Sequence, residues 1–249
     1  MTGRPFGAIV GVTFRSLLSR RRSLLVLIFV VIPVVLAAFA RMVGVMEDPN
    51  GIATVFLDTF VVHVVLPLVA LLFGTAALGS EIDDGTIVYL LAKPIPRWEI
   101  VAAKLLVAEV ATVVLMVPST LAAGLILLAG IPGADTSLAW GYTVGVAVGA
   151  VVYVAIFVAM SVLTSRALVL GLGYILIWEG FLAGLFAGTK NLSVREYTLS
   201  IAQAVAGRDV SDAAPLAVGL AVPLAIVVTV AAVAIAIRRL GSFEVKESG

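Results

Sequence analysis

The chain has 249 residues, of which 62% are hydrophobic and 12% are charged, and its formal net charge is +1. Soluble domains carry about 45–50% apolar and about 25% charged residues, so this composition excludes an ordinary soluble enzyme. With no cysteine and one histidine the chain lacks the ligands of common zinc sites, and its near-neutral charge gives no indication of nucleic-acid binding.

The first predicted element is an amphipathic helix at residues 4–22. Apolar residues recur there at helical spacing, while Arg15 and the cluster Arg20 to Arg22 fall on other positions. This pattern is typical of a helix that lies in the cytoplasmic interface of a membrane. The alternative is a solvated tail.

Long apolar stretches between charged residues predict six membrane-spanning helices. A helix needs about 20 apolar residues to cross about 30 Å of hydrocarbon. Lipid satisfies no backbone hydrogen bond, so we expect an all-α polytopic membrane protein with one transmembrane domain over residues 1–249. The predicted spans cover about residues 23–45, 56–80, 100–128, 138–164, 167–189 and 213–237.

The distribution of basic residues predicts the orientation of these spans. Of the sixteen Lys and Arg residues, only Arg41, Lys190, Arg195 and Arg208 fall on one side. Because cytoplasmic loops carry the excess of Lys and Arg, the other side is predicted to be cytoplasmic. We therefore expect a multi-pass protein of a bacterial cell membrane, with both termini in the cytoplasm.

The cytoplasmic loop at residues 81–99 has a composition unlike that of the other loops. Asp83 or Asp84 is suited to cap a helix, Thr86 to Ala92 form a short apolar run, and Pro94 ends it. The apolar side chains of such a helix need to be shielded from water. Either the membrane surface or another protein shields them.

In this loop the chain resembles the permease subunits of type 2 ATP-binding-cassette (ABC) transporters, the ABC-2 type membrane proteins. Pro96 departs from the family's pattern, in which a Ser or Thr is usual. The six spans, the leading interfacial helix and the long last external loop extend the resemblance over nearly the whole chain. The residues that match the pattern in order are Glu81, Gly85, Thr86, Leu90, Leu91, Pro94, Ile95, Arg97, Glu99 and Lys104.

The resemblance implies a coupling helix that docks on a separate cytoplasmic ABC ATPase. The working unit would contain two ATPase subunits and two permeases, the second permease being another copy of this chain or a homologous one. ATP and Mg²⁺ would be bound by the partner, and this chain would bind no cofactor, metal or nucleic acid. The implied coupling residues are Glu81, Asp84, Gly85, Thr86, Tyr89, Leu90, Leu91, Pro94, Arg97, Glu99 and Lys104.

The sequence itself contains no phosphate-binding loop of the ATPase type. Such a loop needs a Gly-Lys-Ser/Thr motif, and no lysine of this chain follows a glycine. We therefore expect no catalytic residue in the chain. Any chemistry specific to its substrate is expected in the spans.

Three ionisable residues are predicted to lie inside the membrane. Glu179 falls in the outer half of the fifth span, where it either binds a cationic substrate, carries a proton or ties two helices together. His63 lies in the second span at a depth that allows pairing with Glu179, the alternative being a buried, satisfied histidine. Glu109 either faces an inner cavity or pairs with Lys104.

Glycines recur every four residues on the fourth and fifth spans. This spacing permits close approach of a second helix, and a flexible gate is the alternative interpretation. By resemblance, the external loop at residues 190–212 contains short returning helices that cover the transport path. The glycines are Gly141, Gly145 and Gly149 on one span and Gly180, Gly184 and Gly188 on the other.

Taken with the resemblance, these features favour the permease of an ABC exporter that moves a substrate outward. A mostly apolar path with one acid favours an amphipathic drug, a peptide or a lipid, and haem export is also compatible with it. One alternative is a proton-coupled secondary transporter that uses Glu179 and His63. The other is an intramembrane enzyme acting on lipid, for which the acidic group at residues 81–84 lacks a second acidic cluster.

Overall fold

The computed structural model describes residues 7, 10, 11, 13, 20–44, 48–83, 85, 95–182, 189–210 and 216–241. Within these ranges the secondary structure is helical, in agreement with the all-α prediction. The interfacial helix predicted at residues 4–22 lies mostly outside the described residues. So does most of the predicted coupling segment.

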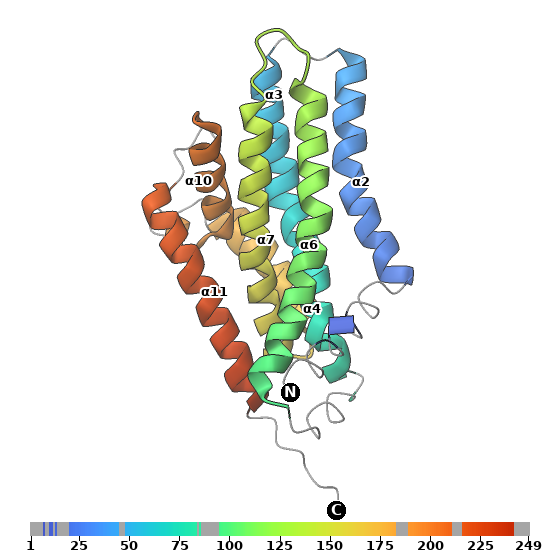
Figure 1. Ribbon diagram of the computed structural model, residues 1–249, viewed down its shortest axis with the longest axis vertical. Helices are drawn as coiled ribbons and strands as arrows, with labels where there is room; N and C mark the ends of the chain where they lie inside the picture. Colours follow the sequence, from blue (N-terminus) through green and yellow to red (C-terminus); the bar gives the residue numbers. More distant parts are fainter. Residues whose placement is uncertain are drawn as a thin grey trace, which may run out of the picture.

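The long described helices run along the length of the bundle (Figure 1). A continuous helix from Pro49 to Asp83 contains a π-helical middle part, and α8 continues directly into the π-helix η2. The start of α2, the start of α6 and the end of α11 lie at the same end of the bundle. The elements are α2 (Arg20–Val43), α3 (Pro49–Val55), η1 (Phe56–Val65), α4 (Leu66–Asp83), α6 (Arg97–Leu128), α7 (Ser137–Leu163), α8 (Ala167–Gly173), η2 (Tyr174–Leu182), η3 (Thr189–Leu192), α10 (Val194–Ala206) and α11 (Val218–Gly241).

Four of the described helices are long and apolar enough to cross a membrane. They are Pro49–Gly79, Arg97–Leu128, Ser137–Leu163 and Val218–Gly241, at the positions of the predicted second, third, fourth and sixth spans. The predicted first and fifth spans correspond to shorter apolar helices, Leu27–Val43 and Ala167–Leu182. The fifth span was predicted to reach residue 189, and its residues 183–188 lie outside the described residues.

Helix α7 forms the centre of the bundle. It packs against α4, α6, α10 and α11, and its large aromatic side chains Tyr142, Tyr153 and Phe157 are fully buried. Figure 1 shows α7 between α6 on one side and α10 with α11 on the other.

The glycines of α7 allow α10 to approach closely. A Cβ atom placed on Gly141 would lie 2.5 Å from the Ala202 carbonyl oxygen, and one on Gly145 would collide with the Thr198 carbonyl oxygen. Gly149 faces the Thr198 side chain in the same way. The two helices are therefore antiparallel, with the N-terminal end of α10 beside the middle of α7. This places part of the segment predicted as an external loop alongside a spanning helix.

We expect Gly145→Ala to destabilise the protein by about 1–3 kcal/mol, because the added methyl group would overlap a backbone oxygen that cannot move aside. The midpoint of thermal unfolding in detergent would measure the loss. Gly173→Ala in α8 is the matched control, since a Cβ atom there meets no atom within 4 Å. Equal effects of the two substitutions would contradict the close contact.

Candidate functional site

Two of the predicted coupling residues form a largely buried ion pair at the end of the bundle where α4 ends and α6 begins. The Lys104 ammonium on α6 donates to Glu81 Oε1 at 2.6 Å and to the Ala77 carbonyl oxygen at 2.9 Å. Lys104 is only 1% exposed. The pair joins the end of α4 to the second turn of α6, so it connects the two helices that flank the loop at residues 81–99.

The other predicted coupling residues are only partly described. Gly85 is exposed in a turn with φ of 68°, where a residue without a Cβ atom is favoured. Arg97 begins α6 and Glu99 lies in its first turn. The remaining residues of the set fall outside the described residues: Asp84, Thr86, Tyr89, Leu90, Leu91 and Pro94.

Glu179 lies at a junction between η2 and the N-terminal end of α10. Its carboxylate accepts hydrogen bonds from the Ser193 hydroxyl at 2.5 Å, the Val194 backbone N–H at 2.9 Å and the Tyr174 hydroxyl at 3.0 Å. The residue is 5% exposed. Ser193 is itself the N-cap of α10 and accepts from the Glu196 backbone N–H. The carboxylate thus satisfies donors at a helix start, where the helix dipole favours negative charge.

A second charged link joins α10 to η1. Arg195 donates to both oxygens of Asp58, with Nη2 at 2.8 Å from Oδ1 and 2.7 Å from Oδ2, and Nε at 3.1 Å from Oδ1. Asp58 is 8% exposed. Two parallel N–H···O bonds make this the strong, directional form of an arginine–carboxylate pair. We call Asp58, Glu179, Ser193 and Arg195 the polar junction.

Of the other two residues predicted to lie inside the membrane, His63 lies near the polar junction and Glu109 lies on α6. His63 on η1 is partly buried and close enough to Glu179, Asp58 and Arg195 to interact with them electrostatically. Glu109 is partly buried on α6, and the carboxylate paired with Lys104 is that of Glu81.

The second glycine series differs from the first in its surroundings. Gly180 is exposed, and a Cβ atom placed on it would lie 3.8 Å from His63 Nε2. Among the described residues, no helix therefore approaches Gly180 as closely as α10 approaches the α7 glycines. Gly184 and Gly188 lie outside the described residues.

At the outer end of the bundle, Arg41 joins α2 to α6. Its guanidinium Nη1 donates to the Ile126 carbonyl oxygen at 2.6 Å and to the Ala129 carbonyl oxygen at 2.8 Å. The last carbonyl groups of a helix have no partner within the helix. A cation at this position also interacts favourably with the helix dipole.

Side chains from two other parts of the chain, Asn50 on α3 and Arg208 after α10, hold the turn between α6 and α7. Asn50 donates to the Gly133 carbonyl oxygen at 2.9 Å and accepts from the Asp135 backbone N–H at 2.8 Å. The Ser137 backbone N–H and the Arg208 guanidinium lower the pKa of Asp135, so its carboxylate stays ionised at neutral pH. The outer ends of α3 and α10 are therefore connected through this turn.

The sequence argument did not identify Asp58, Ser193 or Arg195 as site residues. The pairing of Asp58 with Arg195 joins positions 137 residues apart and depends on the tertiary arrangement. A local signal did exist for the helix start, because the sequence from Ser193 to Glu196 follows the Ser-x-x-Glu pattern of a capping box.

Comparison with known proteins adds one finding. Residues 18–207 match a family model described as ABC-2 family transporter protein. The matched region contains the inner ion pair and the whole polar junction. No curated protein matches the chain.

We expect Glu179→Leu to destabilise the protein more than Glu179→Gln. Leucine leaves the Ser193, Val194 and Tyr174 donors without an acceptor, at a cost of about 1–3 kcal/mol for each buried group, whereas glutamine retains one acceptor oxygen. Thermal unfolding and limited proteolysis near residues 189–193 would measure the difference. A folded Glu179→Leu protein with unchanged stability would show that the hydrogen bonds contribute little.

Proposed function

Because this chain belongs to the ABC-2 transporter family, we propose that it is the permease subunit of an ATP-driven exporter. The match over most of the chain is the observation that carries the proposal, and the apolar helices support it. The chain contributes the membrane path. A separate cytoplasmic ATPase supplies the energy.

The proposed subunit crosses the membrane six times with both termini in the cytoplasm. The shorter helices Leu27–Val43 and Ala167–Leu182 serve as the first and fifth spans beside the four longer ones. Basic residues at the start of α2 and the end of α11 support a cytoplasmic position for this end of the bundle. Two copies of the chain form the membrane part of the exporter.

The loop at residues 81–99 is the proposed docking segment for the ATPase. Its sequence supplies an apolar run between charged residues. The Lys104–Glu81 pair ties the helices on either side of the loop to each other. A movement imposed on the loop would therefore reach α4 and α6 together.

The proposed substrate is an amphipathic drug, peptide or lipid. The helices are largely apolar, and Glu179 is engaged by three donors of its own chain. This engagement favours a helix-tying role for Glu179 over a proton relay with His63. Transport is therefore proposed to draw its energy from ATP.

We expect Leu90→Asp to abolish binding of the cognate ATPase while the chain still inserts in the membrane. Burial of a leucine side chain contributes about 1.5–3 kcal/mol, so its replacement by a charge should weaken binding at least about tenfold. Co-purification of the two subunits from membranes would measure the loss, and ATP hydrolysis by the purified chain alone should be absent.

Arg97→Ala is the control for this experiment. A charge at the rim of an interface affects orientation more than affinity, so this variant should still bind the ATPase. Recovery of the ATPase at wild-type levels with Leu90→Asp would mean that the loop rests on lipid. ATP hydrolysis by the isolated chain would contradict the assignment of the energy source to a partner.

A further inference from the structure

The N-terminal end of α10 is bonded to two spans by charged groups. Arg195 forms its two-pronged ion pair with Asp58 on η1. Ser193 and Val194 donate to the Glu179 carboxylate on η2. These bonds are directional; Asp58, Glu179, Ser193 and Val194 are buried, and Arg195 is partly exposed.

The contact between α10 and α7 is of a different kind. Gly141, Gly145 and Gly149 present a smooth surface to Thr198, Ala202 and Ala206, and the contacts described there are van der Waals contacts. Such contacts are individually weak and have little directionality. A small displacement of α10 along this surface therefore costs less than breaking the polar junction.

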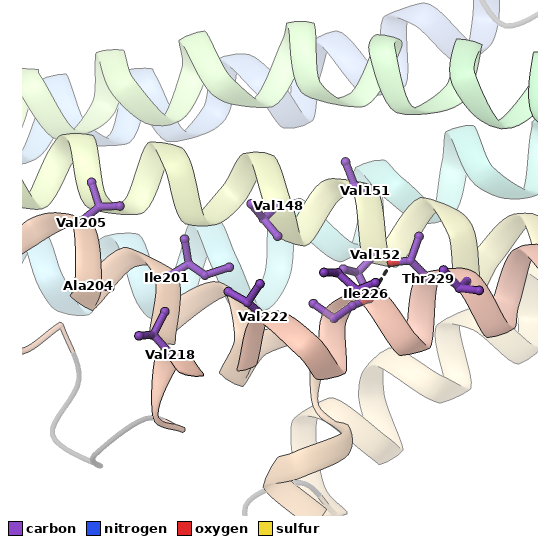
Figure 2. Close-up of a pocket in the computed structure, with 12 residues that line it drawn as sticks. Val148, Val151, Val152, Ile201, Ala204, Val205, Val218, Val222, Ile226 and Thr229 are labelled. Carbon is purple, nitrogen blue, oxygen red and sulfur yellow. Dashed lines mark hydrogen bonds between the residues drawn. The ribbon is translucent and has the colours of Figure 1, made fainter. Parts of the chain in front are cut away.

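The side of α10 that faces α11 is not tightly packed. An apolar groove of about 430 Å³ lies between α7, α10 and α11. Figure 2 shows side chains of the three helices lining it, including Val148 from α7, Ile201 and Val205 from α10, and Val222 and Ile226 from α11. The α10 residues in this lining, Ile201, Ala204 and Val205, belong to the C-terminal half of the helix, so the groove separates that half from α11.

The outer end of α10 is attached to α7 instead. The Tyr142 hydroxyl donates to the Val210 carbonyl oxygen at 2.5 Å, just beyond the end of α10, and lies 3.3 Å from the Thr54 carbonyl oxygen. Tyr142 is fully buried. The end of α10 opposite the polar junction is therefore attached to α7, so a displacement transmitted through the junction would act mainly at the N-terminal end.

We propose that Asp58, Arg195 and Glu179 are positioning residues that make the N-terminal end of α10 move with η1 and η2, across the glycine surface of α7, when the partner subunits bind ATP. The inference rests on the proposed function. The helix that contains η1 continues without a break into α4, which ends at the proposed docking loop. Movement of the loop would therefore be carried along a single helix to the ion pair that holds α10.

The chain contains no cysteine, so a single introduced thiol reports on one position. Thr198→Cys places a thiol of similar size on the buried face of α10 beside Gly149. In the complex of the full chain with its cognate ATPase, we expect ATP bound to a hydrolysis-deficient partner to increase the rate of reaction with N-ethylmaleimide about tenfold. Ala139→Cys, a buried position on α7 next to α6, should show no such increase.

The double substitution Asp58→Asn/Arg195→Met removes both charges of the ion pair. Because neither charge is left unpaired, the double substitution should destabilise the protein less than either single substitution. We expect it to abolish the ATP-dependent increase at Thr198→Cys while ATPase binding and thermal stability are retained. Arg208→Ala, which breaks an exposed ion pair at the outer end of α10, is the matched control and should retain the increase.

Two outcomes would overturn the inference while the proposed function stands. One is a complex that binds and hydrolyses ATP but shows the same Thr198→Cys reactivity with and without ATP. The other is an ATP-dependent increase that persists in the Asp58→Asn/Arg195→Met protein. Failure of the chain to bind its cognate ATPase would instead overturn the proposed function, and this inference with it.

Discussion

A helix that begins inside a lipid-embedded bundle has backbone N–H groups that neither lipid nor water satisfies. Helix α10 begins beside the middle of a spanning helix, so its first donors need acceptors from the protein. The N-cap Ser193 and the carboxylate of Glu179 supply them. The buried acid on η2 is therefore explained by the position at which α10 starts.

This arrangement depends on the small residues of α7. Only a surface without side chains lets α10 approach closely enough for its start to meet η2, and Gly141, Gly145 and Gly149 provide that surface. The approach also brings Arg195 to Asp58 on η1. The glycine series and the polar junction are thus two parts of one structural solution. At the other end of the bundle, the Lys104–Glu81 ion pair joins α4 to α6.

Much of the fold could be predicted because long apolar runs between charges have few stable forms in a membrane. The limits of α6 and α7 agree with the prediction to within a few residues, since charged or turn-forming residues flank both runs. The site was harder to predict. The depth of Glu179 follows from helix geometry, but two of its three partners lie fourteen and fifteen residues later, on another helix start. The Asp58–Arg195 pair joins distant parts of the sequence, and no local periodicity indicates it.

The π-helical segments η1 and η2 have a consequence for how the faces of these spans are assigned. A π-helix bonds residue i to residue i+5, so it holds more residues in each turn than an α-helix. The residues of α4 are therefore rotated, relative to those of α3, from the positions that a uniform 3.6-residue repeat would give. A helical wheel drawn for the whole span from Pro49 to Gly79 would place the residues before and after η1 on the wrong relative faces. Wheels drawn separately on either side of η1 would assign the two faces correctly.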